Sequence, residues 1–156
     1  MAKTTWFLVA DGARARLLTL KDERGSDERR LVPAFDQEFI GSNIPSREID
    51  ADRPGRSFDS AGEGRHAMEP PTDPRRKRKA DFARSIAILL DAEAKRGAFA
   101  QVVIAAPPQA LGDLRGELSA AVQSRVTAEI NKDLVEASDA ELFDRLNEAL
   151  KDALFR

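Results

Sequence analysis

The sequence has no cysteine, only one histidine and no long hydrophobic run. The missing cysteine excludes disulfides, thiolate metal sites and a cysteine nucleophile, and it is compatible with a reducing cytosol. His66 and carboxylates are then the remaining candidates for metal ligands. The apolar run near the N-terminus has about seven residues, which is too short to span a bilayer, and it lacks a cleavage-site pattern. The sequence therefore predicts a cytoplasmic protein without membrane contact.

Carboxylates are missing where a metal-dependent nuclease of the ribonuclease H type would need them. Such an enzyme holds metal ions between carboxylates on its first and fourth strands, but the apolar stretches 4–10 and 99–106 contain none. A hydrolase triad is disfavoured because His66 is the only imidazole and no serine lies in a Gly-x-Ser-x-Gly elbow. Five acidic residues between positions 50 and 69 follow no known calcium-loop spacing. We therefore expect neither a metal nor a cofactor.

Residues 41–79 are the most unusual part of the chain. They contain four of the nine glycines, five of the eight prolines and the only histidine. A compact domain rarely has more than about 12–15 consecutive residues without secondary structure unless that loop is functional or disordered. The total of 156 residues, 42% of them hydrophobic and 33% charged, fits one soluble domain. We therefore expect a single domain over residues 1–156 with a long mobile loop at 41–73.

Before this loop, the sequence predicts three antiparallel strands. Residues 4–10 are apolar on both faces, which is typical of a central strand. Asp11 and Gly12 predict a tight hairpin turn in which both positions take a positive φ, followed by a strand at 13–20. A third strand at 30–40 contains a proline and is therefore expected at a sheet edge.

After the loop, helices and strands should alternate. Asp73 and Pro74 predict a helix start, and Gly97 a helix end. A strand is expected at 99–106. The next helix is expected to present the apolar residues Leu111, Leu114, Leu118 and Val122. The last strand is expected to have one apolar face, formed by Val126, Ala128 and Ile130, and one solvent-exposed face. The final helix follows a Ser138–Glu141 capping box and has the apolar residues Leu142, Phe143, Leu146, Leu150 and Leu154.

This order of three strands followed by α-β-α-β-α predicts the α/β class. It is the order of a ribonuclease-H-like mixed sheet in which right-handed crossovers place helices on both faces. The fold alone does not give a function.

A basic run at the predicted helix start is the strongest electrostatic feature. It consists of Arg75, Arg76, Lys77, Arg78 and Lys79. Five consecutive helical residues cover more than one turn, so they cannot all point the same way. Cations at a helix N-terminus also oppose the helix dipole, at a cost of a few tenths of a kcal/mol each. Two interpretations stay open, a patch that contacts phosphate and a solvated helix start.

His66 also allows two interpretations. An unperturbed imidazole titrates near pH ~6.5 and could move protons or contact phosphate, but the polar surroundings of His66 favour an exposed loop histidine without a role. The neighbouring Gly62-Glu63-Gly64 is similar to part of a phosphate-binding loop, although no strand precedes it and no helix follows it directly.

Several motifs occur in the order found in a known family. They are WFLVADGARARLL at 6–18, DRPGR at 52–56, GEGRH at 62–66, DFARSIAILL at 81–90 and VVIAAPPQALGDLR at 102–115. With them, the chain resembles the bacterial host-attachment protein family over nearly its whole length. That family is similar to bacterial relatives of the archaeal and eukaryotic peptide-chain release factors, specifically to their middle domain.

The resemblance implies a release-factor-middle-domain-like domain whose loop faces the ribosome or tRNA. In release factors a Gly-Gly-Gln tripeptide in the corresponding loop positions the attacking water, and this chain lacks that tripeptide. The loop residues that the resemblance places in an RNA-binding role are Arg53, Arg56, Gly62, Gly64 and Arg65, and Arg56, Arg65 and His66 stand in place of the tripeptide. His66 is then the candidate for a catalytic residue if peptidyl-tRNA is hydrolysed.

Two classes of function follow from these observations. The first is a binding module for the ribosome or tRNA, with hydrolysis of peptidyl-tRNA as an added activity. The second is a protein-interaction factor for attachment to host cells, which recruits a protein partner through the 41–73 loop without catalysis.

Overall fold

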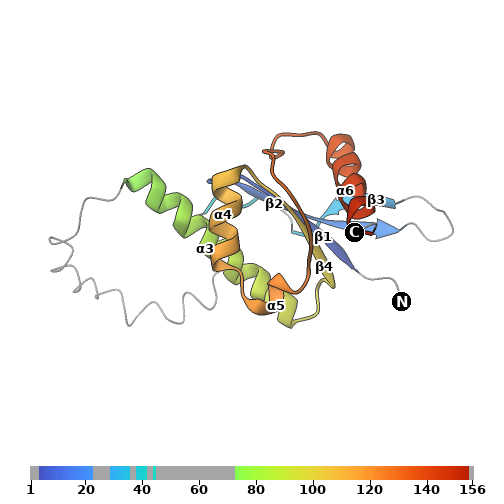
Figure 1. Ribbon diagram of the computed structural model, residues 1–156, viewed down its shortest axis with the longest axis horizontal. Helices are drawn as coiled ribbons and strands as arrows, with labels where there is room; N and C mark the ends of the chain where they lie inside the picture. Colours follow the sequence, from blue (N-terminus) through green and yellow to red (C-terminus); the bar gives the residue numbers. More distant parts are fainter. Residues whose placement is uncertain (1–3, 23–28, 36–37, 42–43, 45–72, 155–156) are drawn as a thin grey trace.

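The computed structural model describes residues 4–22, 29–35, 38–41, 44 and 73–154. In this part of the chain, strands form one mixed sheet in the order β3-β2-β1-β4-β5 (Figure 1). Their bounds are Thr5–Ala10 (β1), Ala15–Asp22 (β2), Arg29–Pro33 (β3), Gln101–Ala105 (β4) and Val126–Ile130 (β5). β1 is antiparallel to β2 and parallel to β4, and β4 is parallel to β5.

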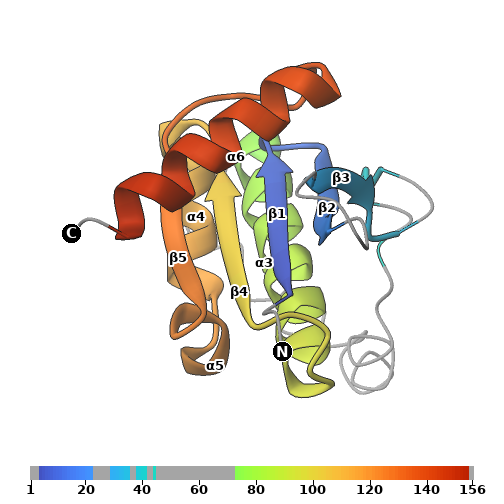
Figure 2. The same cartoon turned by 90° about the vertical axis from the view of Figure 1, so that its right-hand side faces the viewer.

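Helices cover both faces of this sheet (Figure 2). Their bounds are Pro74–Lys95 (α3), Pro108–Glu117 (α4), Ala120–Gln123 (α5) and Asp139–Leu154 (α6). α3, α4 and α5 pack on one face and α6 on the other. The predicted mixed α/β class with helices on both faces is confirmed, whereas the more specific ribonuclease-H-like assignment stays a prediction. None of the described helices combines the length and the hydropathy that a membrane span needs.

β1 is the central strand, and it is buried along its whole length, as predicted. Its side chains alternate between the two layers, with Trp6 and Leu8 in the cluster under α3 and Phe7 and Val9 in the cluster under α6. Each fully buried side chain of this size contributes about 1.5–3 kcal/mol. The apolar character of both faces of β1 therefore fixes a three-layer arrangement.

The predicted tight turn after β1 is wrong in its conformation. Ala10 pairs with Ala15, so the connection has four residues, and neither Asp11 nor Gly12 has a positive φ. Instead, the Asp11 carboxylate accepts hydrogen bonds from the backbone N–H groups of Ala13 and Arg14, each at 2.7 Å. An aspartate side chain can replace a backbone turn contact in this way, so Asp11 is a turn residue for a different reason from the one expected.

β3 lies at the sheet edge, as its proline predicted, but it is shorter than the expected strand at 30–40. It ends at Pro33, which has no N–H to continue the ladder. Phe39 returns to pair with Ala15 through an isolated bridge.

α3 begins and ends where the sequence predicts. The Asp73 side chain caps the helix by accepting from the backbone N–H of Arg75 at 3.0 Å, and Pro74 is the first helical residue. Gly97 follows the helix with a φ of +76°, a conformation that favours glycine. At α6, the Ser138 hydroxyl accepts from the backbone N–H of Glu141 at 3.1 Å, which confirms the serine half of the predicted capping box.

Two predicted patterns are broken by local irregularities. The expected single helix through Leu111 and Val122 is interrupted because Leu118 and Ser119 are extended, and Ser119 caps the separate α5. In β5 a register shift places Val126 against the α3 side of the core, while Ala128 and Ile130 pack on the α6 side. The predicted common face of these three residues is therefore wrong.

Candidate nucleic-acid interface

The basic run occupies the first two turns of α3, which project beyond the sheet (Figure 1). Two of its five cations are paired with carboxylates. Arg76 makes a two-pronged contact with Asp113 of α4, with Nη1 to Oδ2 at 2.7 Å, and this hydrogen bonding raises the pKa of the Arg76 guanidinium. Lys77 Nζ lies 3.0 Å from Asp81 Oδ2, one helical turn further on. These two side chains serve the fold.

The other three cations lie together on a different side of the helix. Arg75, Arg78 and Lys79 are at positions i, i+3 and i+4, a spacing that places side chains on one helix face. All three are exposed, and none forms an ion pair with a described residue. The expectation that the five residues cannot all point the same way is thus confirmed.

These three side chains line a pocket of about 440 Å³. Phe82 and Ser85 extend the same helix face along the pocket, and the opposite wall comes from the β1–β2 loop and the segment after β3. The residues of that wall are Gly12, Ala13, Ile40 and Gly41. Phe82 is only 7% exposed, and Ile40 is 55% exposed. The pocket therefore combines apolar walls with cations at its border.

Among the described residues, Asp81 is the only acidic one that lines this pocket. Its carboxylate is engaged by Lys77, which offsets its charge. The described lining residues comprise three cations and one paired carboxylate, so their charge is positive and favours an anionic ligand.

Gly12 allows Lys79 to lie across the end of β1. A Cβ atom at Gly12 would come within 2.7 Å of Lys79 Cδ and 2.8 Å of Cγ. Real Cβ atoms do not approach other carbons so closely, so a side chain at position 12 would displace the lysine. The glycine of the Asp11-Gly12 pair is needed for close approach rather than for backbone freedom.

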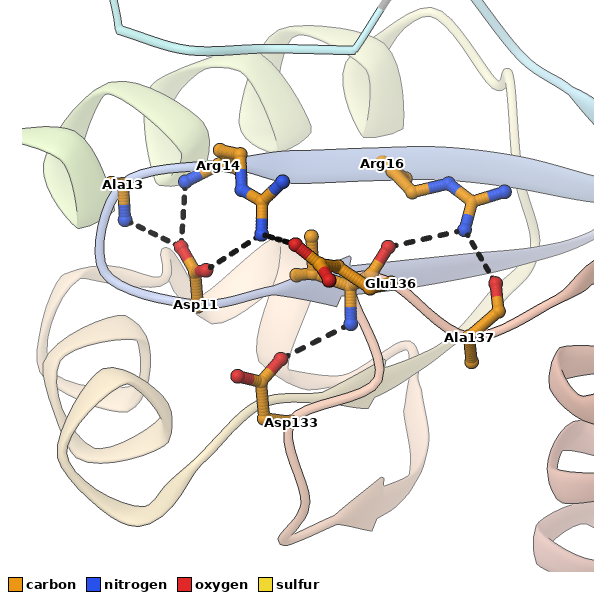
Figure 3. Close-up of polar contacts among 8 residues, drawn as sticks. Asp11, Ala13, Arg14, Arg16, Asp133, Glu136 and Ala137 are labelled. Atoms are coloured by element: carbon orange, nitrogen blue, oxygen red, sulfur yellow. Dashed lines mark hydrogen bonds and ion pairs between the residues drawn. The ribbon is translucent and has the colours of Figure 1, made fainter.

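A polar cluster holds the β1–β2 loop in place (Figure 3). Arg14 Nη2 donates to Glu136 Oε2 at 2.9 Å and lies 3.7 Å from Asp11 Oδ2. The hydrogen bond to Glu136 is the main cause of the raised pKa of Arg14. Because Arg14 is engaged by two carboxylates, it positions the loop and does not add to the positive pocket.

Arg16 ties β2 to the segment before α6 in the same region (Figure 3). Its guanidinium donates to the backbone carbonyls of Val135 at 3.3 Å and Ala137 at 3.1 Å, and it pairs with Asp139 at 3.1 Å. Several carboxylates lie near these arginines, yet the described part of the chain contains no group of three or more residues that could hold a metal ion.

The structure accounts for only one part of the predicted site. Arg75 to Lys79 are placed as above, whereas the loop candidates Arg53, Arg56, Gly62, Gly64, Arg65 and His66 lie outside the described residues. Gly12, Ala13 and Phe82 also line the pocket and were not predicted as site residues. The helical spacing from Arg75 through Lys79 to Phe82 was a signal that could have placed Phe82 on the same face.

The fold and this site define a mixed α/β protein with a basic helix face beside a pocket. The model of the family described as "Protein required for attachment to host cells" matches residues 6–146, and the chain belongs to that family. No curated protein matches the chain in sequence.

Two solved structures resemble the chain weakly. One is an archaeal translation termination factor, with 12% identity and a TM-score of 0.39, in which the match covers 96% of this chain and 39% of the other. The second is described as an archaeal protein, with 12% identity, a TM-score of 0.42, and coverage of 97% and 37%. The chain thus spans less than two fifths of each structure's length, and similarity at this level gives no information on activity. The relationship to release factors stays a prediction.

Proposed function

We propose that the chain is an RNA-binding module that contacts phosphates through Arg75, Arg78 and Lys79. The observation that carries this proposal is the separation of the basic run into two sets. The cations that support the fold have carboxylate partners, whereas the three at the pocket have none among the described residues.

The free-energy cost of placing cations at the N-terminus of α3 supports an external anionic partner. The first turn of α3 itself contains no acidic residue, and the Asp73 cap is one carboxylate against the five cations that follow it, so these cations oppose the helix dipole with only partial local compensation. Arg75 and Lys79 are separated by about 6 Å along the helix axis, which lets the three side chains contact neighbouring phosphates of one strand. The apolar wall at Phe82 and Ala13 suits the sugar and base edges of an unpaired nucleotide.

The test is the salt dependence of binding to a single-stranded RNA oligonucleotide. Each phosphate contact contributes roughly −0.7 to the slope of log affinity against log salt. The variant Arg75→Gln/Arg78→Gln/Lys79→Gln should therefore flatten the slope by about two units. Fluorescence anisotropy at several salt concentrations gives the two slopes directly.

The matched control is Arg76→Gln/Lys77→Gln, which removes charge from the same two helical turns. Because both side chains are already paired, this variant should change the slope by well under one unit. Equal slopes for the wild-type protein and the triple variant would assign the whole run to a solvated helix start and refute the proposal.

We further propose that the RNA partner is the ribosome or tRNA. Tagged protein in cell lysate should then co-sediment with ribosomal fractions on a sucrose gradient or co-purify with tRNA. The triple variant should remain at the top of the gradient and carry no tRNA. Wild-type protein that carries neither partner would contradict this assignment while leaving general RNA binding intact.

Hydrolysis of peptidyl-tRNA by His66 stays a prediction from the sequence. A general base contributes about 10²–10⁴ in rate, so His66→Ala should lose at least roughly two orders of magnitude while RNA affinity stays unchanged. Absence of hydrolysis by the wild-type protein would establish a binding module without catalysis.

The family description favours a second candidate function, a protein-interaction factor in attachment to host cells. Its partner would be a protein recruited through the 41–73 loop. The two candidates are separated by the ultraviolet absorbance of purified protein. Bound nucleic acid raises the 260/280 nm ratio and is lost at high salt, whereas a protein partner leaves this ratio unchanged.

A further inference from the structure

A second pocket of about 440 Å³ lies on the sheet face that carries α6. Its residues come from three strands and one helix: Arg29 of β3, Gln101 of β4, Thr127 of β5, and Asn147, Leu150 and Lys151 of α6. α6 crosses the carboxyl-terminal halves of β1 and β4 (Figure 2), and the pocket lies toward the opposite ends of these strands, where β4 begins. It is therefore separate from the pocket beside α3.

The floor of this pocket is a fixed polar network. Gln101 Nε2 donates to Thr5 Oγ1 at 2.6 Å, and Gln101 Oε1 accepts from Thr127 Oγ1 at 3.1 Å. Thr5 is only 4% exposed, and it is the one buried polar residue in the described part of the chain. These two bonds fix the Gln101 amide and leave its second N–H without a partner among the described residues, so it can donate into the pocket.

Two cations border the pocket, and none of the described residues that line it is acidic. Arg29 Nη2 donates to Asn147 Oδ1 at 3.2 Å, which orients the guanidinium toward α6. Lys151 is exposed in the last turns of α6. Neither side chain forms an ion pair with a described residue.

The end of α6 contributes charge of the opposite sign. A helix C-terminus is equivalent to about −0.5 elementary charge, and a lysine in its last turn offsets this. Lys151 alone is sufficient for that role. Arg29 is therefore an additional positive charge, and the pocket remains positive overall.

We infer that this pocket binds a small organic anion with a short apolar body. A carboxylate or phosphate head lies between Arg29 and Lys151 and accepts from the Gln101 amide. The apolar body packs along Leu150 and Ala153, which form the aliphatic wall. This site does not depend on the proposed RNA binding.

The test uses octanoate and octyl phosphate as probes for the two kinds of head group, with acetate as the probe without an apolar body. Two-dimensional NMR of the full chain reports on the site through the Gln101 side-chain amide and the Thr127 and Leu150 backbone amides. Octanoate or octyl phosphate should shift these resonances saturably. Acetate should bind at least roughly tenfold more weakly, because each buried methylene contributes about 0.8 kcal/mol.

The variant Arg29→Gln/Lys151→Gln should weaken binding of the preferred probe by roughly tenfold, as expected for two partly exposed charge contacts. Lys132→Gln is the matched control, since Lys132 is an exposed lysine that does not line this pocket, and it should leave the affinity unchanged. Shifts spread over the whole surface, no saturable shift, or equal affinity of the double variant and the wild-type protein would each overturn the inference.

Discussion

At the scale of single residues, the contact between Gly12 and Lys79 links the end of the central strand to the basic helix face. The aliphatic stem of Lys79 lies across a position where any Cβ atom would collide with it. A flexible side chain can move away from such a collision at low energetic cost. The identity of residue 12 therefore controls where the Lys79 ammonium lies more than it controls the stability of the fold.

This contact predicts the behaviour of Gly12→Ala. Because Gly12 has no positive φ, alanine is tolerated by the backbone, and the free energy of unfolding should change by less than about 1 kcal/mol. RNA affinity should fall roughly two- to fivefold, the loss expected for one displaced surface charge. Urea unfolding and fluorescence anisotropy measure the two quantities.

Gly112→Ala is the control for this prediction. Gly112 lies within α4, and a Cβ atom there would meet nothing within 4 Å. Alanine in a helix interior should stabilise the protein by up to about 1 kcal/mol and leave RNA affinity unchanged. Unchanged RNA affinity in Gly12→Ala would show that the position of Lys79 does not matter for binding.

At the scale of elements, one carboxylate connects the long helix to the irregular segment after α4. Asp91 of α3 accepts a hydrogen bond from the Ser119 hydroxyl and pairs with Lys95, with Nζ to Oδ2 at 2.9 Å. The bond from Ser119, followed by the contact with Lys95, lowers the pKa of Asp91. Ser119, at the break in the predicted helix, therefore contacts α3 through Asp91.

The lowered pKa of Asp91 determines how the free energy of unfolding should change with pH. A carboxyl whose pKa is lower in the folded state stabilises the fold above its unfolded-state pKa of about 3.9 and loses this contribution as pH falls through the folded value. Ser119→Ala should lower the free energy of unfolding by about 2 kcal/mol at pH 7, because both the cap of α5 and the hydrogen bond to the Asp91 carboxylate are lost. At a pH below the folded-state pKa of Asp91, only the cap loss of about 1 kcal/mol should remain.

Denaturant unfolding of the wild-type protein and Ser119→Ala across this pH range measures the difference. Ser124→Ala is the matched control, because the Ser124 hydroxyl donates to the backbone carbonyl of Ala121 rather than to a carboxylate. Its effect should not depend on pH. If Ser119→Ala lowers the free energy of unfolding by the same amount at all pH values, the hydrogen bond from Ser119 to Asp91 adds nothing to stability.

Elements with strong local signals were predictable from the sequence, and those decided by contacts between distant segments were not. The apolar faces of β1 and the Asp73–Pro74 start of α3 depend on neighbouring residues, and both were predicted correctly. The bulge in β5 lies where this strand pairs with β4, and Ser119, at the helix break, contacts Asp91 of another helix. No local pattern reveals either contact. For the same reason the cations of the site were predictable from the sequence, but the wall that Gly12 and Ala13 form opposite them was not.

At the scale of the whole molecule, the sheet separates the two proposed sites. The proposed RNA-binding face belongs to the layer of α3, and the proposed organic-anion pocket is lined by residues of α6. α6 packs on the other face of the sheet from α3 (Figure 2). β1 and β4 lie between the two helical layers and are buried on both faces over nearly their whole length. With a formal net charge of only −2, no strong overall field connects the sites, and charge effects beyond about 8 Å are screened at physiological salt.

This separation predicts that the two ligands bind independently. Coupling between sites requires that one ligand change the affinity for the other through two arrangements of the protein, and a close-packed sheet layer offers no such pair of arrangements. The affinity for RNA should therefore change by less than about twofold at saturating octanoate, a coupling below about 0.4 kcal/mol. Anisotropy titrations of RNA with and without octanoate measure this factor, with acetate at the same ionic strength as the control for salt. A tenfold change that disappears in Arg29→Gln/Lys151→Gln would show instead that the α6 pocket regulates the RNA-binding face.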